Sequence, residues 1–476
     1  MTQQDGKASS NASSNASSNA AAGKDSEGDP GQVLGLSDAT AIIVGLIVGA
    51  GIFGTPAIVA GAAGSEAMAI LAWVIGGLIS IIGAMCYAEL ATAYPSAGGE
   101  YHFLGRAFGR SLAFLYGWAR LTVIVAGSIA IFAFLFGEYL SRVISLGEHS
   151  AAIWAGLIVI VLSVVNYIGI REGKAAQDVF TLLEVAGLVL IVVAGLFLAP
   201  ALSTVEPTAA TAAAPAASTP WYVGAGPGLA MIFVLFTYGG WNDAAYISAE
   251  VKDPKRNMSR ALILSISIVT VLYVLVNLAY FRGLGFDAVV RSDAVAADLL
   301  KRVWGEFGEK LISIMIAIAA LTSVNGSIIV GARSNYALGR DWPILGWLGH
   351  WDARHGSPRN ATLAQGAIAL ALVLLGAIQK TGFKGLVEFT APVFWAFFLL
   401  TGISLFVLRW RDSATERPFR VPGYPLLPLV FVAACAYLLY SSIDYHGRNA
   451  VVGVAVLAVG ALVLLLARWR ERAAAN

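Results

Sequence analysis

The chain has 476 residues with a net charge of +2, and 13% of them are charged while 58% belong to the apolar set AVILMFWYC. Soluble globular proteins carry about 25% charged residues, so this composition excludes water as the main solvent and requires apolar side chains to face lipid. The small net charge gives no indication of a nucleic-acid partner. Both cysteines, Cys86 and Cys435, lie in apolar runs, which excludes a disulfide framework and a zinc cluster.

Residues 1–36 come first, and they are small and polar, with the repeat SNASSNASSNA. This segment has too few apolar residues to bury a core, so it predicts a disordered cytoplasmic tail. Runs without Asp, Glu, Lys or Arg follow, most of them longer than the ~18 residues that a helix needs to cross a bilayer. They predict twelve transmembrane helices, at 39–65, 67–88, 121–137, 150–170, 185–205, 207–242, 261–281, 311–332, 360–379, 389–408, 421–443 and 449–467.

The positive side chains between these runs predict the orientation of the chain. Lys and Arg concentrate in alternate loops, and the positive-inside rule then places both termini in the cytoplasm. The low-complexity loop 206–222 is extracellular and the tail 471–476 is cytoplasmic under this rule. We therefore expect an all-α, multi-pass protein of the cell (inner) membrane.

Two of the predicted helices contain glycine clusters near the middle of the membrane. The first helix holds GAGIFGTP at 49–56, and the sixth holds TYGGWN at 237–242. Freed peptide groups in hydrocarbon are costly, so such interruptions persist where they line a cavity. Because both fall in the first helix of a group of five, they predict an inverted repeat, with helices 1–5 at 37–205, helices 6–10 at 223–410, and two further helices at 411–470.

The interrupted ends indicate the chemistry of a ligand. Amides of 49–54 lie at the N-terminal end of a half-helix, where a carboxylate is favoured. Carbonyls of 236–239 end the other half-helix and favour an ammonium group. An α-amino acid carries both groups on one carbon and is the expected substrate class.

Three segments resemble the amino acid-polyamine-organocation superfamily of permeases, in particular its L-type amino acid transporter branch. They are VGLIVGAGIFGTP in the first helix, FTYGGWNDAAYISAEVKDPKRNMSRAL at 236–262 and TSVNGSIIVGARSNYALGRDWP at 322–343. The resemblance implies a leucine-transporter-like fold, alternating access and exchange of amino acids. It also implies these roles: carboxylate contacts at Gly49, Ala50 and Gly51, amine-binding carbonyls at Ile47, Phe236 and Gly239, a gating ring at Phe236, and a polar site residue at Asn242.

Charged residues inside the predicted helices depart from the family pattern. Glu184 stands where this branch usually has Lys, and Arg120 stands where relatives often have an acid. A lone intramembrane charge costs at least ~2.5 kcal/mol, so we expect these two side chains to form an ion pair. The alternatives for Glu184 are a proton acceptor, a cation ligand and a recognition site for cationic side chains.

Other polar residues have two interpretations each. Asp243 is either solvated in a vestibule or contacts a basic substrate or a proton. Thr322 and Ser323 form interhelical hydrogen bonds or coordinate Na⁺.

The aromatic side chains of Phe236 and Trp241 favour neutral substrates.

The sequence contains no H-E-x-x-H, G-x-S-x-G or P-loop motif, so neither an enzyme nor an ATP-driven pump is expected, and no cofactor is expected either. The loop Ser141 to Ser150 lacks Cys, and we therefore expect no disulfide-linked heavy subunit. The sequence predicts a secondary transporter that exchanges neutral amino acids. The alternatives are proton- or sodium-coupled uptake of cationic amino acids or polyamines, and an amino-acid-sensing membrane receptor.

Overall fold

The structure, a computed structural model, describes residues 34–96, 98–169, 174–199, 223, 225–244, 251–352, 356–445 and 447–475. Most of the predicted tail and the low-complexity loop lie outside these ranges. All regular elements within them are helices. Those of the first half are α2 (Leu36–Ile47), α3 (Gly51–Gly54), α4 (Pro56–Ala63), α5 (Glu66–Ala93), α6 (Gly99–Phe108), α7 (Arg110–Ala119), the π-helical turn η1 (Arg120–Ile124), α8 (Val125–Val143), α9 (Ser150–Ile168), α10 (Lys174–Val193) and the π-helical turn η2 (Ala194–Leu198).

The second half contains longer helices. They are α11 (Pro227–Thr237), α12 (Pro254–Leu284), α13 (Phe286–Arg291), α14 (Val295–Asp341), the 3-10 helix η5 (Pro343–Gly349), α15 (Arg359–Ile378), α16 (Gly382–Arg411), α17 (Leu426–Tyr445) and α18 (Gly447–Ala475). Pro254 is the first residue of α12, so it begins a helix, as suits a residue that lacks a backbone N–H.

Ten helical segments of the described chain are long and apolar enough to cross a membrane, and Leu182–Leu198 is a shorter apolar helix. The predicted sixth helix is represented by α11 and a short 3-10 turn, after which residues 245–250 lie outside the described ranges. The protein is therefore an all-helical, multi-pass membrane protein.

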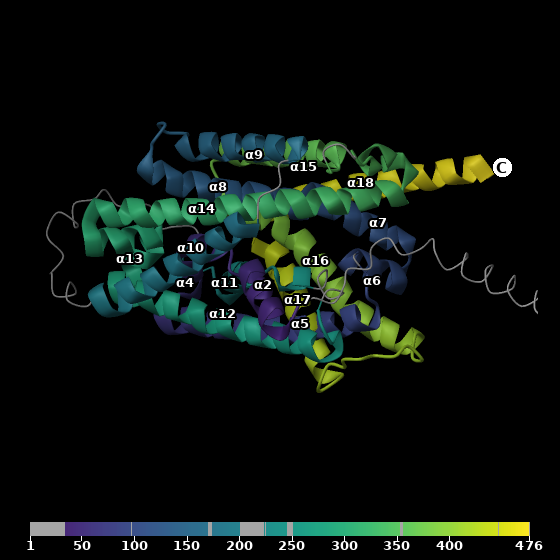
Figure 1. Ribbon diagram of the computed structural model, residues 1–476, viewed down its shortest axis with the longest axis horizontal. Coiled ribbons are helices and arrows are strands. Elements are labelled where there is room, and N and C mark those ends of the chain that lie inside the picture. The colour runs from purple at the N-terminus through teal and green to yellow at the C-terminus, as the bar shows by residue number, and fades with distance from the viewer. Residues whose placement is uncertain are drawn as a thin grey trace, which may run out of the picture.

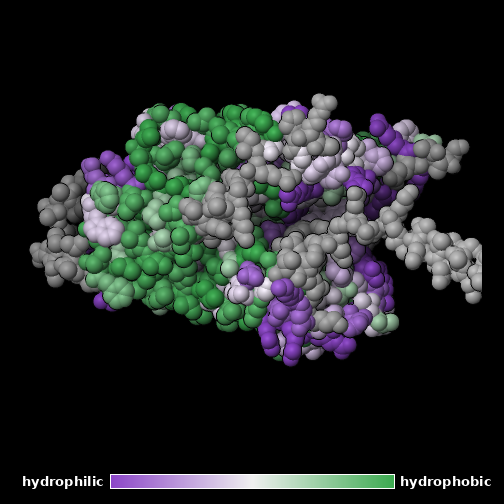
Figure 2. Space-filling model, viewed as in Figure 1, coloured by the Kyte–Doolittle hydropathy of each residue, from purple (hydrophilic) through white to green (hydrophobic). Residues whose placement is uncertain are grey.

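The helices lie roughly along the long axis of the molecule (Figure 1). Helices α9 and α15 pack together on one side and α5 and α12 on the other, with α2, α11 and α16 between them. We call the end with the C-terminus the C-terminal face and the opposite end the α13 face. Hydrophilic side chains concentrate at the C-terminal face, while hydrophobic ones cover most of the surface towards α13 (Figure 2).

The first predicted span is interrupted. Helix α2 ends at Ile47, Val48 has ψ 85, and α3 begins only at Gly51. A second irregularity follows at Thr55, directly before Pro56 at the start of α4. A proline is accepted at a helix start but not in its interior, so Pro56 accounts for the second one.

The sixth span is interrupted in the same way. Helix α11 ends at Thr237, a turn follows at 238–240, and a 3-10 segment occupies 241–244. Gly240 has φ +106, which L side chains rarely adopt. The two interruptions that the glycine clusters predicted are therefore both present.

The interrupted spans run antiparallel along each other. The N–H of Gly226, before α11, donates to the carbonyl of Ala62, at the end of α4. At the other end of α11, Gly240 lies against Leu46 and Ile47, at the end of α2. This arrangement is expected if the two spans belong to oppositely oriented halves.

The segments flanking the interruptions are also joined at the C-terminal face. Leu34 and Val251 form a parallel β-bridge, in which the N–H of Lys252 donates to the carbonyl of Leu34 over 2.8 Å. Val251 is fully buried. The bridge links the chain before α2 to the chain that follows the sixth span.

Candidate functional site

The two interruptions meet at one buried place. The hydroxyls of Thr55 and Thr237 are 3.0 Å apart, and both residues are buried. A Cβ added to Gly51 would lie 3.6 Å from the Cα of Thr237, and one added to Gly240 would lie only 2.1 Å from the carbonyl oxygen of Leu46. The contact at Gly51 is an ordinary van der Waals distance, whereas Gly240 lets the two backbones approach more closely than a side chain would allow.

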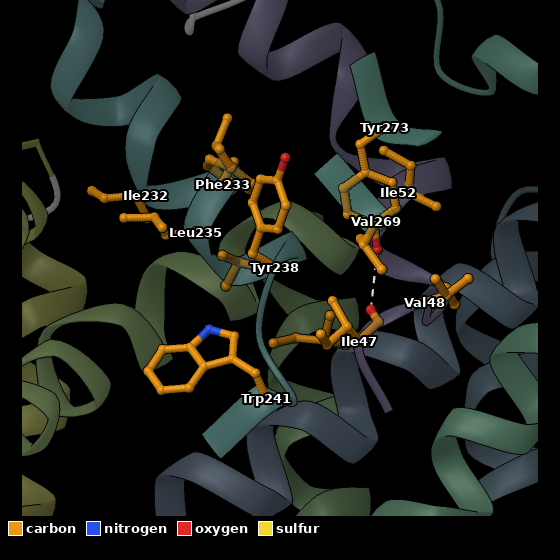
Figure 3. Packing of buried hydrophobic residues seen from close by; sticks show 14 of the residues in the cluster. Ile47, Val48, Ile52, Ile232, Phe233, Leu235, Tyr238, Trp241, Val269 and Tyr273 are labelled. Carbon is orange, nitrogen blue, oxygen red and sulfur yellow. Dashed lines mark hydrogen bonds between the residues drawn. The ribbon is translucent and has the colours of Figure 1, made fainter. Parts of the chain in front are cut away.

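The carbonyls at this place already have partners. The carbonyl of Ile47 accepts hydrogen bonds from the N–H of Gly49 at 2.8 Å and from the hydroxyl of Tyr273 at 3.0 Å (Figure 3). The same hydroxyl is 3.4 Å from the carbonyl of Thr237, and the carbonyl of Phe236 accepts from the N–H of Gly239. Tyr273, on α12, therefore bridges the ends of α2 and α11 where the sequence predicted a substrate ammonium group.

Phe236 lies beside a small cavity between α8, α11 and α16. The cavity is lined by uncharged side chains, namely Ile124, Ser128, Ile232, Phe236, Val387, Thr390, Ala391, Phe394 and Trp395. The ring of Phe236 is half-buried, and its centroid is 6.3 Å from that of Phe132 and 6.4 Å from that of Phe383. Phe236 therefore lies between two other aromatic rings at the wall of a cavity, and its gating role stays a prediction.

Trp241 points elsewhere. Its ring packs edge-on against Tyr87, Phe398 and Phe431, in contact with α5, α16 and α17. Figure 3 shows it on the side of the interruption away from Tyr273. Trp241 lines a second, apolar cavity together with Gly239, Ser80 and Cys435. The structure therefore does not bring Trp241 together with Phe236 at one cavity wall.

The predicted ion pair between Arg120 and Glu184 is wrong. Arg120, at the start of η1, lies 3.9 Å from a carboxylate oxygen of Glu100 and 3.7 Å from one of Asp243. Its guanidinium also donates to the hydroxyls of Tyr116 at 3.1 Å and Ser334 at 3.2 Å. The prediction compared only the depths of the two residues, and a shared depth does not fix the direction in which each helix points its side chain.

Asn242 belongs to the same group of side chains. Its amide nitrogen is 3.1 Å from Glu100 Oε1 and 3.4 Å from Asp243 Oδ1. We call these six residues the Arg120 cluster: Glu100, Tyr116, Arg120, Asn242, Asp243 and Ser334.

Glu184 lies in α10 and is 6% exposed, and its Oε1 has no hydrogen-bond partner among the described residues. Helix α10 packs against α12, the helix that carries Tyr273. A buried carboxyl group without a partner is costly when charged, so such groups often have a functional role in membranes.

Thr322 and Ser323, on α14, each donate a hydrogen bond to the carbonyl four residues earlier in their own helix. The hydroxyl of Ser323 also faces the first interruption, since it lies 3.6 Å from where a Cβ on Gly49 would stand. Both oxygens keep lone pairs that can accept, so hydrogen bonding between helices and Na⁺ coordination both remain predictions.

Helix α6, which contributes Glu100 to the Arg120 cluster, also carries His102. Burial lowers the pKa of His102, and the neighbouring Arg106 guanidinium lowers it further. Arg106 itself donates to Asp412 at 2.8 Å, and this hydrogen bond lowers the pKa of the Asp412 carboxyl group.

The sequence interpretation missed Tyr273, Glu100 and Tyr116. Tyr273 could have been noticed as a hydroxyl in the apolar run 261–281, but nothing in the sequence points to its partners. Glu100 lies in the short helix α6, between two spans, where a charged residue is common and therefore gives no signal.

Comparison with known proteins identifies the class. The sequence profile of the amino acid permease family matches residues 34–466. The chain belongs to this family, and it is an amino acid transporter.

Individual relatives are similar over most of their length. The chain is 30% identical to the b(0,+)-type amino acid transporter 1 of Mus musculus over 420 residues, covering 86% of this chain and 82% of the relative. It is also 30% identical to the b(0,+)-type amino acid transporter 1 of Homo sapiens over 418 residues, with the same coverage. Identity to the human large neutral amino acids transporter small subunit 2 is 29% over 463 residues, covering 92% of this chain and 81% of the relative.

The expectation that no disulfide-linked heavy subunit exists is contradicted by these relatives, one of which is named a small subunit. The expectation rested on the absence of Cys between Ser141 and Ser150. A missing cysteine removes one covalent attachment point, but it says nothing about association through other surfaces.

Proposed function

We propose that this permease exchanges neutral amino acids by alternating access, in a cell (inner) membrane with both termini in the cytoplasm. The C-terminal face is then the cytoplasmic one, in agreement with the distribution of Lys and Arg between loops. Leu182–Leu198 and the interrupted helix that begins with α11 serve as the fifth and sixth of twelve spans.

The observation that carries this proposal is the contact between the two interruptions. In this proposal the peptide N–H groups of Gly49, Ala50 and Gly51 bind the substrate carboxylate, that of Gly49 after it leaves the carbonyl of Ile47. The carbonyls of Ile47, Phe236 and Gly239 bind the substrate ammonium group. The hydroxyl of Tyr273 bonds to the carbonyl of Ile47, so an arriving ammonium group replaces it or binds beside it.

The neutral character of the substrate follows from the cavity beside Phe236. Among the described residues, its walls hold apolar side chains and two hydroxyls, those of Ser128 and Thr390. A charged substrate side chain would lose its hydration there without gaining an opposite charge. The name of one relative, a transporter of large neutral amino acids, agrees with this choice.

Counterflow in proteoliposomes tests the proposal. Liposomes that contain the purified protein and unlabelled leucine should take up labelled leucine about tenfold faster than liposomes that contain no amino acid. Faster uptake of labelled lysine than of leucine would instead support transport of cationic substrates. Thermal stabilisation by leucine without any counterflow would indicate a receptor.

A second candidate function is coupling of uptake to protons, and Glu184 favours it. Its buried carboxyl group has an oxygen without a hydrogen-bond partner among the described residues, and its helix α10 packs against α12, which carries Tyr273. Glu184→Gln should then abolish stimulation of uptake by an acidic outside medium and leave counterflow intact, while Glu184→Asp keeps both. Equal pH dependence in the parent and in Glu184→Gln would reject coupling through this residue.

A further inference from the structure

The Arg120 cluster joins the segment after the sixth-helix interruption to three other parts of the molecule. Asn242 and Asp243 belong to the 3-10 segment 241–244, Glu100 to α6, and Ser334 to α14. Tyr116 and Arg120 lie in α7 and η1. Any motion of the segment 241–244 away from α6 and α14 must therefore separate members of this cluster.

Arg120 occupies the centre of the cluster. Its side chain is 7% exposed, and it contacts the two carboxylates and two hydroxyls given above. It begins the π-helical turn η1, and an extra residue in a helical turn changes the direction of the side chains that follow. The four residues LTVI after Arg120 are uncharged, so Arg120 is the only charged side chain that this turn presents.

Asn242 connects the cluster to the predicted substrate site. Its Oδ1 accepts from the N–H of Gly240 at 3.3 Å, within the interruption itself. Its amide nitrogen is held between Glu100 and Asp243. The orientation of the Asn242 side chain is thus set from one side by the interruption and from the other by the two carboxylates.

We propose that Glu100 and Arg120 are positioning residues that hold Asn242 and the segment 241–244 in place, forming a latch that opens when substrate passes the C-terminal face. The link between this latch and substrate passage rests on the proposed function, but the latch itself does not. The latch acts on one face only, because Arg120 in η1 and Glu100 in α6 hold the segment 241–244, which follows the interruption on the side of the C-terminal face.

The first test measures opening without transport. Ala244, the last described residue of the segment, is fully buried, so Ala244→Cys in a background with Cys86→Ala and Cys435→Ala should react slowly with a methanethiosulfonate reagent. Arg120→Gln or Glu100→Gln should accelerate this reaction about tenfold, and Arg120→Lys should accelerate it less. Arg359→Gln, which removes an ion pair with Asp352 outside the cluster, should leave the rate unchanged.

The second test measures the sidedness of transport. In right-side-out and inside-out membrane vesicles, Arg120→Gln should change the KM for leucine at the C-terminal face about tenfold and the KM at the α13 face less than about twofold. A general structural defect would change both. An unchanged labelling rate of Ala244→Cys in both latch variants would overturn the proposal. Absence of leucine exchange in the parent protein would overturn the proposed function and leave the labelling result valid.

Discussion

Gly240 has no room for a side chain. An added Cβ would lie 2.1 Å from the carbonyl oxygen of Leu46, and its φ of +106 is itself unfavourable for other residues. Gly326 offers the contrast, since it lies in a regular part of α14 with nothing within 4 Å of an added Cβ.

Gly240→Ala should therefore destabilise the protein by about 3 kcal/mol, because backbone strain and a steric clash add up. Gly326→Ala should keep or slightly raise stability, since Ala is the better helix former. Thermal unfolding in detergent measures both, and leucine counterflow should be lost only in Gly240→Ala. Equal melting temperatures for the two variants would contradict the close contact of the interruptions.

His102 gives the protein a pH-dependent stability. The pKa of His102 is lowered in the folded protein. As the pH falls, His102 therefore takes up a proton in the unfolded chain, near its ordinary pKa of 6.5, before it does so in the folded protein. This contribution to stability is complete well above pH 6.5 and decreases as the pH falls below it. His102→Gln should make the unfolding temperature less dependent on pH between about pH 7 and pH 5. A parent and a variant with parallel pH profiles would show that His102 is not responsible.

At the scale of elements, α13 and the first part of α14 cover the α13 face and are tied to α8. Arg142, at the end of α8, lies 3.9 Å from Asp298 and 3.6 Å from Glu309, on either side of a kink at Trp304 and Gly305. Lys301 also pairs with Glu309, at 2.7 Å. Glu309 is 8% exposed, so both of its ion pairs are partly shielded from water.

Glu309→Gln should weaken the attachment of α13 and the first part of α14 to α8. A cysteine introduced at the fully buried Ala297, in a background without Cys86 and Cys435, should then react with a thiol reagent about tenfold faster, which corresponds to 1.4 kcal/mol. Glu306→Gln is the matched control, because Glu306 forms an exposed pair with Lys310 within one helix. Similar acceleration in both variants would show that the pair across the kink has no special role.

The sequence predicted most elements of the fold, because a helix in lipid must satisfy its own peptide groups and therefore appears as a long charge-free run. It also located both interruptions, since glycine clusters are unfavourable inside such runs. The partners of individual side chains were less predictable. Arg120 lies against Glu100, in the loop before the third predicted helix, and not against Glu184. Trp241 turned towards α17. Both outcomes depend on helix rotation rather than on position along the chain.

At the scale of the whole molecule, the bridge between Leu34 and Val251 predicts that the chain before α2 and the chain after the sixth span move together. Paired residues in a bridge lie within disulfide range, so Leu34→Cys with Val251→Cys should cross-link upon oxidation. We expect at least about half of the leucine exchange to survive this cross-link, because it joins parts that move as one unit.

The two single-cysteine variants serve as controls for the oxidation treatment. Loss of exchange upon cross-linking, with recovery after reduction, would show that these two segments separate during the transport cycle.

The antiparallel contact between α4 and α11 has a consequence for the direction of transport. If the two interrupted spans belong to oppositely oriented halves, the fold itself favours neither direction of transport, and the substrate concentrations on the two sides decide the direction of net flux. Any preference for one direction must then come from features that differ between the two ends. These are the Arg120 cluster on the side of the C-terminal face and the ion pairs of Arg142 across the kink at the α13 face.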